Sequence, residues 1–438
     1  MKRKLTVLIM SACLIASLIP ATVFAQSSSK EKADLTISSV KELKQFAKSV
    51  SNGNSYKGKI IKLTEDIKFD KTVKNNFKSI GMSNSSDFWD YTEFLGTFDG
   101  GGHTISGINQ TNGYGLFYEI GTTGVVKNII IRNCNFKGSL GSIAGINSGE
   151  IENCHNESDI VGDAGLGGIV GTNYIDGIVI NCSNSGNIIT KKSESSSGRF
   201  FGTGGIVGTN IGKIQNCYNV GNIFSKSEDD DREHIGGIVG FNDITFIPHS
   251  NGDIEAKTGS IENCYNTGKV TAKGEDIDVG GLAGSLGYAI MKNSYYCQDT
   301  NKKMIGDDNM EGVKNSKELS SNEMKKYSFV TTLNKNRGSN TSWSKWELTS
   351  SSEYPTLVTK YEVTFKSSKL GYTKTNRSYA YAGQTVTLTA VPNKNYKTST
   401  VVVKTASGKK VTVKKVNGKY QFKMPKGKVV ITTTFKKK

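Results

Sequence analysis

The stretch "GGIVGTNIGKIQNCYNVGNI", residues 204–223, decides the fold, because the chain repeats it several times. Near copies are "GGIVGTNYIDGIVINCSNSGNI" at 167–188 and "GGIVGFN" at 236–242, which "SIENCYNTGKV" completes at 260–270. Each copy carries Gly-Gly, two apolar residues and Gly ahead of Asn-Cys-x-Asn. The shortest full period, from Ser142 to Gly168, is 26 residues, which is typical of stacked supersecondary units.

The repeats predict an all-β fold, a right-handed parallel β-helix in which each repeat forms one turn. Short β-runs such as "GIVG" and "KIQNC" alternate with Gly and Asn, and no helical pattern separates them. Each turn would cover the apolar face of the next. The glycines suit corners that need a positive φ or a close approach of two backbones. Four asparagines, which tolerate left-handed geometry, are expected to stack at one turn: Asn153, Asn181, Asn216 and Asn263.

The cysteines recur with the repeat. Five of them are predicted to form one inward column, one per turn and about 4.8 Å apart: Cys134, Cys154, Cys182, Cys217 and Cys264. Cys297 is out of register, because Ser294 occupies the corresponding position. Disulfides are the usual alternative in a secreted chain, but free thiols suit a tight apolar interior. A zinc site is not indicated, since there is no Cys-x-x-Cys.

The first 25 residues are predicted to be a signal peptide. Lys2, Arg3 and Lys4 precede an apolar run, and small-residue cleavage is expected after Ala25. No other segment reaches the roughly 18–20 apolar residues that a transmembrane helix needs. The sequence therefore predicts an exported protein without a transmembrane segment.

The repeated residues resemble a known family. "GGIVGTN…NCYNVG" and "GGLAG" (280–284) are similar to the GLUG motif of bacterial secreted and surface proteins, and the resemblance covers roughly 35–357. It implies an architecture rather than an activity. Some relatives carry a metallopeptidase domain that cleaves immunoglobulin A, but this chain lacks His-Glu-x-x-His, so that activity is not implied.

The chain end has a different pattern. From Tyr361 apolar residues alternate with polar ones, which predicts a small all-β domain. "GQTVTLTAVPNKNY" (383–396) and "YQFKMPKGKVVITTTF" (420–435) resemble the divergent bacterial repeat related to internalin B-repeats, a common wall-facing module.

The positive charge is concentrated in the same segment. Residues 358–438 hold 18 Lys and one Arg against a single acid, Glu362, so their charge of +18 exceeds the +17 of the whole chain. Such a surface attracts polyanions. Candidate binding residues are Lys409, Lys410, Lys414, Lys415, Lys419, Lys423, Lys426 and Lys428. Export argues against nucleic acid and for anionic cell-wall polymers or glycans.

The domain boundaries follow from these patterns. Residues 1–25 form the signal peptide, 26–110 a helical cap and first coils, and 111–300 the repeats. The N-terminal cap is expected from Val40, Leu43, Phe46, Ala47 and Val50, which share one helical face. Residues 301–357 are expected to cap the other end, and 358–438 form the basic domain.

Other chemistry is sparse. Asp87, Asp90 and Glu93, near Trp89 and Tyr91, form an acidic-aromatic loop that could hold a sugar or simply be a surface insertion. Asp99 and His103 look catalytic, but a turn-and-cap role is expected. Acidic loops before the Gly-Gly pairs suggest Ca²⁺ ligands, with solvated charge as the alternative: Asp229, Asp230, Asp231, Glu275, Asp276 and Asp278.

The leading hypothesis is a non-enzymatic, secreted, cell-wall-associated binding or adhesion protein of a Gram-positive bacterium. The β-helix would display loops, and the basic domain would hold anionic polymers. The alternative is a carbohydrate-active enzyme, a polysaccharide lyase or glycosidase, on the same scaffold. Beyond Ca²⁺ no cofactor is indicated, and no feature of the sequence indicates an oligomeric state.

Overall fold

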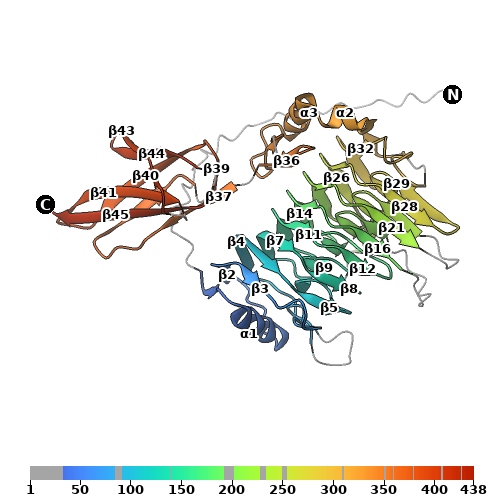
Figure 1. Cartoon of the computed structure of the whole chain (residues 1–438), viewed down its shortest axis with the longest axis horizontal. Helices are drawn as coiled ribbons and strands as arrows, with labels where there is room; N and C mark the ends of the chain where they lie inside the picture. Colours follow the sequence, from blue (N-terminus) through green and yellow to red (C-terminus); the bar gives the residue numbers. More distant parts are fainter. Residues whose placement is uncertain are drawn as a thin grey trace, which may run out of the picture.

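The computed structural model describes residues 33–83, 91–138, 140–191, 202–226, 233–248, 254–307, 310–349, 352–358, 360–377, 379–405, 408–425 and 427–438. These residues form a parallel β-helix of stacked coils and a small two-sheet module beside its first coils (Figure 1). The predicted β-helix, its N-terminal helical cap and the C-terminal all-β domain are confirmed. The predicted signal peptide lies outside the described residues.

One wall of the coil is a continuous parallel sheet, which we call the long sheet. Its strands pair in register from coil to coil, with Ile151 opposite Val179 and Ile214 opposite Ile261. The strands are β1 (Leu35–Ile37), β2 (Ile60–Leu63), β3 (Ile67–Lys68), β4 (Thr97–Ser106), β7 (Val125–Arg132), β10 (Glu150–Glu152), β11 (His155–Glu157), β14 (Ile178–Ile180), β15 (Ser183–Asn184), β19 (Lys213–Gln215), β20 (Tyr218–Asn219), β26 (Ser260–Glu262), β27 (Tyr265–Asn266), β31 (Ile290–Lys292), β32 (Tyr295–Cys297), β33 (Val313–Lys314) and β34 (Lys317–Leu319).

Two further parallel sheets close each coil. The second sheet contains β5 (Asn109–Thr111), β8 (Asn135–Lys137), β12 (Ile160–Gly162), β16 (Ile188–Thr190), β21 (Ile223–Lys226) and β28 (Val270–Lys273). The third sheet contains β6 (Phe117–Ile120), β9 (Ala144–Asn147), β13 (Val170–Asn173), β18 (Val207–Asn210), β23 (Val239–Asn242) and β30 (Ala283–Ser285). Inward side chains such as Ile160, Ile206 and Ile214 are fully buried and stack on their counterparts in adjacent coils. Burial of these apolar columns holds the coils together.

The Gly-Gly motif is explained by close backbone approach. A side sheet of β17 (Gly202–Gly204), β22 (Glu233–Gly236) and β29 (Ile277–Gly280) packs over the third sheet. A Cβ on Gly205 would lie 2.2 Å from the Gly237 carbonyl oxygen, and one on Gly208 would lie 2.6 Å from that of Gly171. Neither Gly205 nor Gly208 has a positive φ. Of the two expected reasons for these glycines, the close approach is therefore the operative one.

The asparagines take the left-handed positions instead. Asn153, Asn181, Asn216 and Asn263 have φ between 52° and 56°, as the repeat predicts. Their side-chain amides also bond from coil to coil, with Asn263 donating to Asn216 at 2.8 Å. A second, unpredicted amide ladder runs through the third sheet, where Asn173 Nδ2 donates to Asn210 Oδ1 at 2.8 Å. These ladders satisfy amides that are buried inside the coil.

The cysteine column needs a correction. Cys154, Cys182, Cys217 and Cys264 stack, and Ser294 continues the column. Cys134 does not belong to it: its amide donates to Ser158 Oγ at 2.9 Å. The reason is the register of the long sheet. His155 pairs with Ile130, so the residue that aligns with Cys154 in the preceding coil is Ile129, and the Asn153 side-chain amide bonds to Asn128. Cys134 follows five residues later and aligns with Ser158; sequence spacing alone does not reveal this difference.

The N-terminal end of the coil is covered by α1 (Val40–Ser51), at the base of the coil in Figure 1. Leu43, Phe46, Ala47 and Val50 are buried as predicted, whereas Val40 is only partly buried. Ser39 accepts a hydrogen bond from the Glu42 amide and begins the helix. The aromatic ring of Phe46 packs edge-on against Phe94 in the first coils.

The expected cap at the other end lies mainly along a flank. Short α2 (Ser321–Met324) and α3 (Tyr327–Arg337) pack against Tyr265 and Tyr295, which point outward from the long sheet. The following segment, with β35 (Trp346–Glu347) and β36 (Thr356–Leu357), reaches back along the coil. Trp346 Nε1 donates to Asn216 Oδ1 at 2.7 Å. These residues bury a tyrosine column that would otherwise be exposed, so the segment covers a side of the coil.

The remaining strands project from the coil or form the module. A hairpin of β24 (Ile244–Pro248) and β25 (Ile254–Thr258) interrupts the repeat between β23 and β26. In the module, the docking sheet has the order β39 (Tyr379–Tyr381), β37 (Lys360–Phe365), β45 (Val429–Lys437), β41 (Tyr396–Thr405), β42 (Lys410–Val411). The distal sheet has the order β38 (Gly371–Thr375), β40 (Thr385–Pro392), β44 (Lys419–Lys423), β43 (Val413–Val416).

Candidate polyanion-binding site

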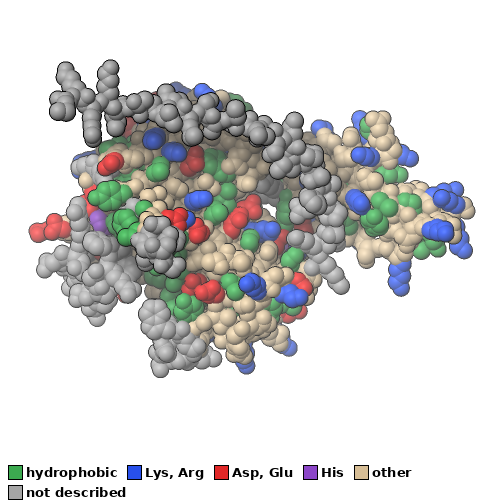
Figure 2. All heavy atoms as spheres, turned by 180° about the vertical axis from the view of Figure 1, so that it is seen from behind, with side chains coloured by type: hydrophobic (Ala, Val, Ile, Leu, Met, Phe, Trp, Pro, Cys, Tyr) green, Lys and Arg blue, Asp and Glu red, His purple; other side chains and the backbone are tan. Residues whose placement is uncertain are grey.

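The module is a two-sheet sandwich whose alternating sequence sets the direction of its lysines. Its core includes Val386, Leu388, Val403, Phe422 and Ile431, each at most 3% exposed. Side chains next to these residues along each strand point to the opposite face. Lysines therefore cover the outer faces of both sheets, and Figure 2 shows basic side chains spread over the projecting module.

The single acid of the module is buried where the module meets the coil. Glu362, on β37, is 7% exposed and contacts Lys62 Nζ of β2. Lys428 Nζ lies 3.6 Å from its other carboxylate oxygen. Because this carboxylate is enclosed between two lysines, it neutralises none of the outer charge. Among the described residues of the module, the solvent-facing side-chain charge is therefore entirely positive.

A second polar contact between the module and the coil lies beside Glu362. The Tyr379 hydroxyl donates to Asp99 Oδ2 of β4. Asp99 Oδ1 accepts from Asn128 Nδ2 and from the Gly101 amide, both at 2.9 Å. Burial, followed by the negative charge of Asp99, raises the pKa of Tyr379. Tyr379 therefore stays protonated and able to donate.

Asp99 and His103 do not form a catalytic pair. Asp99 holds a turn, as expected, but it also binds the module, which the sequence did not indicate. His103 Nδ1 lies 3.2 Å from Asp66 Oδ1, on the far side of a bulge in β4.

The predicted lysines fall on different faces. Lys414, Lys419 and Lys423 are exposed on the outer face of the distal sheet. Lys415 lies over the ring of Tyr420, with Nζ 5.7 Å from the centroid. Lys409 and Lys410 belong to the edge of the docking sheet, and Lys428 is half-buried against Glu362. Lys426 lies outside the described residues.

Sequence reasoning missed the lysines that face one another. Lys404 of β41 lies directly opposite Lys410 of β42, and Lys397 of β41 lies directly opposite Lys436 of β45. All four side chains are exposed. The alternation in "VVVKT" and "TTTFKKK" marks the strands that carry them, but cross-strand partners follow only from the register.

The cysteine column is held together by hydrogen bonds from coil to coil. Cys217 Sγ accepts from the Cys182 amide at 3.3 Å and lies 3.2 Å from the Gln215 carbonyl oxygen. Burial raises the pKa of Cys154 and of Cys217, which keeps both as thiols. The six cysteines within the described ranges are all buried and free. The column was expected to be purely apolar; it is instead hydrogen-bonded from coil to coil.

The predicted calcium ligands are not assembled in the described residues. Asp229, Asp230 and Asp231 lie outside them. Glu275 and Asp276 are exposed in a turn, and Asp278 Oδ2 lies 2.9 Å from His234 Nδ1 on the neighbouring strand. The part of the chain that the structure describes holds no group of three acidic, His or Cys side chains placed for a metal. Calcium binding stays a prediction.

The acidic-aromatic loop is partly described. Asp87, Trp89 and Asp90 lie outside the described residues. The ring of Tyr91 packs on Tyr118 with centroids 4.7 Å apart, and Tyr118 packs on Tyr114. Glu119 is 7% exposed, and burial together with the charge of Glu93 raises its pKa. Two neighbouring carboxyl groups, one of them with a raised pKa, are an arrangement that acid–base catalysis uses.

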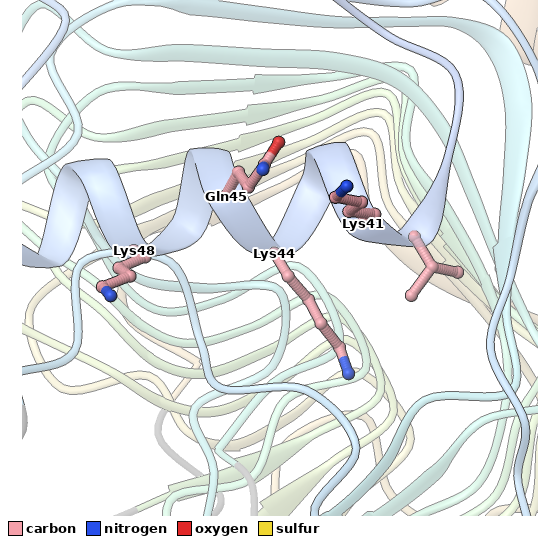
Figure 3. Close-up of a pocket in the computed structure, with 5 residues that line it drawn as sticks. Lys41, Lys44, Gln45 and Lys48 are labelled. Carbon is pink, nitrogen blue, oxygen red and sulfur yellow. The ribbon is translucent and has the colours of Figure 1, made fainter.

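A shallow surface hollow lies beside α1 and is lined by Val40, Lys41, Lys44, Gln45 and Lys48 (Figure 3). Figure 3 shows the three lysines projecting away from the helix axis in different directions. Lys44 Nζ lies 5.8 Å from the centre of the Phe69 ring, so its ammonium group makes a cation–π contact with the coil. In the described part of the chain, no helix has the length and apolar character needed to cross a membrane.

Comparisons with known proteins agree with the repeat and the module. The GLUG motif matches residues 162–189 and 231–271, and the divergent InlB B-repeat domain matches residues 361–438. Halomucin of Haloquadratum walsbyi is 38% identical over 94 residues, which is 20% of this chain and 1% of halomucin. The chain thus spans a very small part of that relative. It is a repeat protein with features in keeping with a secreted or surface location.

Two solved structures are similar over much of the chain. A protein of Bacteroides ovatus, provisionally named an immunoglobulin A1 protease, is 20% identical and covers 74% of this chain and 91% of its own, with a TM-score of 0.48. An IgA1 protease is 16% identical and covers 67% of this chain and 22% of its own, with a TM-score of 0.44.

Proposed function

We propose that this protein is a non-enzymatic, exported, wall-associated binding protein whose module, residues 361–438, holds anionic polymers. The observation that carries the proposal is the burial of Glu362 against Lys62 and Lys428. It leaves a surface of exposed lysines without a carboxylate of its own. Such a surface attracts polyanions without a shaped pocket.

The coil serves as the scaffold in this proposal. Between the predicted signal peptide and the module the charges nearly balance, so the coil adds little to the attraction of polyanions. Glu362 and Tyr379 fix the module against the first coils. A bound polymer would therefore be held at a defined place relative to the loops of the β-helix.

Sedimentation with purified Gram-positive cell walls tests the proposal. The attraction is screened as the Debye length falls to about 10 Å near 0.1 M salt. The full chain is expected to sediment with walls at low salt, to elute as salt rises, and to lose binding when teichoic acid is removed. Salt-independent binding would overturn the proposal.

Charge variants locate the binding. Replacing Lys404, Lys410 and Lys423 by Gln should weaken wall binding, because all three are exposed on the module. The matched control removes the same charge from α1 through Lys41→Gln, Lys44→Gln and Lys48→Gln. Equal losses in the two variants would contradict binding by the module. Point variants are preferable to deletion, since deletion would uncover Lys62 and Asp99.

A second candidate function rests on Glu119. Its raised pKa, beside Glu93 and three tyrosines, suits a general acid in a carbohydrate-active enzyme. Incubation with pectins, glycosaminoglycans and mucins tests it through new reducing or unsaturated ends. Products that disappear in Glu119→Gln would favour this function, and no product with any substrate would exclude it for that panel.

A further inference from the structure

The docking sheet carries two pairs of directly opposed lysines on one outer face. In β41 the buried residue Val403 precedes Lys404, so Lys404 points outward, on the same face as its strand partner Lys410. In β45 the buried residue Phe435 precedes Lys436, which points outward on the same face as its strand partner Lys397. The partners of each pair lie side by side on neighbouring strands.

A bulge brings both pairs to the same face. The register of β41 and β45 shifts between Thr398 and Thr400, where β41 has one extra residue. Without that residue, strand alternation would turn Lys397 inward, because a shift of one position exchanges the two faces of a strand. The bulge therefore places Lys397 on the same outer face as Lys404.

Like charges directly opposite each other destabilise a sheet. In the described residues of the module no acidic side chain relieves the repulsion within the lysine pairs, since Glu362 lies against the coil. We propose that each lysine pair clamps one phosphate or sulfate group, which contacts both ammonium groups at once. This inference rests on the proposed polyanion binding and names the face and the kind of ligand.

The spacing of the pairs defines that ligand. Val430 is the β45 partner of Lys404, and Lys436 lies six residues further along the strand. At about 3.3 Å per residue the two clamps are roughly 20 Å apart. Between them the face carries Thr400 and Thr434, whose hydroxyl oxygens are 2.7 Å apart. The ligand is a linear polymer that bears phosphate or sulfate groups and spans both clamps; a single ion occupies only one.

Affinity measurements on the full chain test the clamps. The variants are Lys404→Gln with Lys410→Gln, and Lys397→Gln with Lys436→Gln. The matched control, Lys419→Gln with Lys423→Gln, removes equal charge from exposed lysines of the distal sheet that oppose Thr385 and Val416. The probes are long-chain polyphosphate, tripolyphosphate, heparin, a heparin disaccharide and single-stranded DNA.

Each clamp variant should lose about tenfold in affinity for the long polymers, because two charge-assisted contacts disappear. The control should lose about twofold, the effect expected of exposed charges. Tripolyphosphate and the disaccharide should bind much more weakly than the long polymers. A preference for polyphosphate or for heparin then identifies the anionic group.

Three results would overturn the clamps. They are an equal loss in the control, short probes that bind as tightly as long ones, and clamp variants that bind single-stranded DNA, which is also a linear phosphate polymer, as tightly as the wild type does. An equal loss in the control leaves diffuse polyanion binding intact. If the wild type binds none of the polymers, the proposed function fails as well.

A stability measurement separates binding from folding. Without a ligand, Lys410→Gln should raise the melting temperature slightly, because it relieves the repulsion from Lys404. Lys423→Gln, which removes no opposed pair, should not. If Lys410→Gln lowers the melting temperature, the two side chains stabilise the sheet and the clamp argument is wrong.

Discussion

The first coils and the module treat charge in opposite ways. In the first coils of the long sheet, unlike charges meet from coil to coil: Lys127 lies between Asp99 on one side and Glu152 on the other. Arg132 forms a two-pronged ion pair with Glu157, with Nε–Oε2 at 2.5 Å and Nη2–Oε1 at 2.8 Å. On the docking sheet, like charges meet, as Lys404 and Lys410 do.

The difference separates a scaffold from a binding surface. The coil satisfies most of its buried polar groups internally, through ion pairs, amide ladders and hydrogen-bonded thiols. The module places its only acid at the junction and leaves its lysines to solvent. A surface that retains like-charge repulsion in the free state gains most from an external anion.

The largest expected effect contrasts a glycine of the coil with one of the module. In Gly205→Ala, the new Cβ would meet the Gly237 carbonyl oxygen at 2.2 Å. We expect a loss of about 3 kcal/mol or more in the free energy of unfolding, because backbone must move. In Gly418→Ala, nothing lies within 4 Å and only the φ of +76° is strained, which costs about 1 kcal/mol. Chemical denaturation measures both, and equal losses would break the comparison.

The next effect concerns the junction between the two regions. Glu362→Gln leaves Lys62 and Lys428 without a carboxylate, so docking of the module should weaken by about 3 kcal/mol, as for a broken buried pair. Faster proteolysis between the coil and the module, and a larger radius of gyration, would report it. Glu353→Gln is the control, because its ion pair with Lys325 is exposed. A compact, resistant Glu362→Gln variant would contradict this role.

A smaller effect concerns the pH dependence of the stability of the coil. The pKa of Glu119 is raised, first by burial and then by Glu93. A raised folded-state pKa contributes stability that is present below the unfolded pKa, near about 4.3, and is lost as pH rises through the folded value. The wild type should therefore lose stability relative to Glu119→Gln between acidic and neutral pH. Melting curves across that interval test it, and parallel pH profiles would exclude it.

The smallest effect concerns the thiol ladder. Cys217→Ser should cost less than about 1 kcal/mol, because a hydroxyl can make the same bonds. Ser294 already does so in this column, accepting from the Cys264 amide at 3.3 Å and donating to the Lys292 carbonyl at 2.9 Å. Cys217→Ala leaves the buried Cys182 amide unpaired and should cost about 1–3 kcal/mol. If Ser proves as costly as Ala, the ladder depends on sulfur packing and not on hydrogen bonding.

The sequence by itself determined the architecture. Local rules suffice for a repeat: the period near 26 residues, the asparagines at left-handed turns and the apolar face of α1 each fix a nearby backbone state. The change to a period of two marked the module, and the charge count marked it as basic. Predictions from these features succeed because each coil contacts only its neighbouring coils, so the local sequence pattern determines the fold.

Tertiary structure decided the details that concern binding. The register of the long sheet places Ile129, and not Cys134, in the cysteine column, and one extra residue near Thr398 turned Lys397 to the face of Lys404. Register changes the partners and the face of a residue without changing the composition. The pairing of Glu362 with Lys62 joins residues 300 positions apart. Such partners are set by which surfaces meet, and a contact between distant segments leaves no periodic trace in either one.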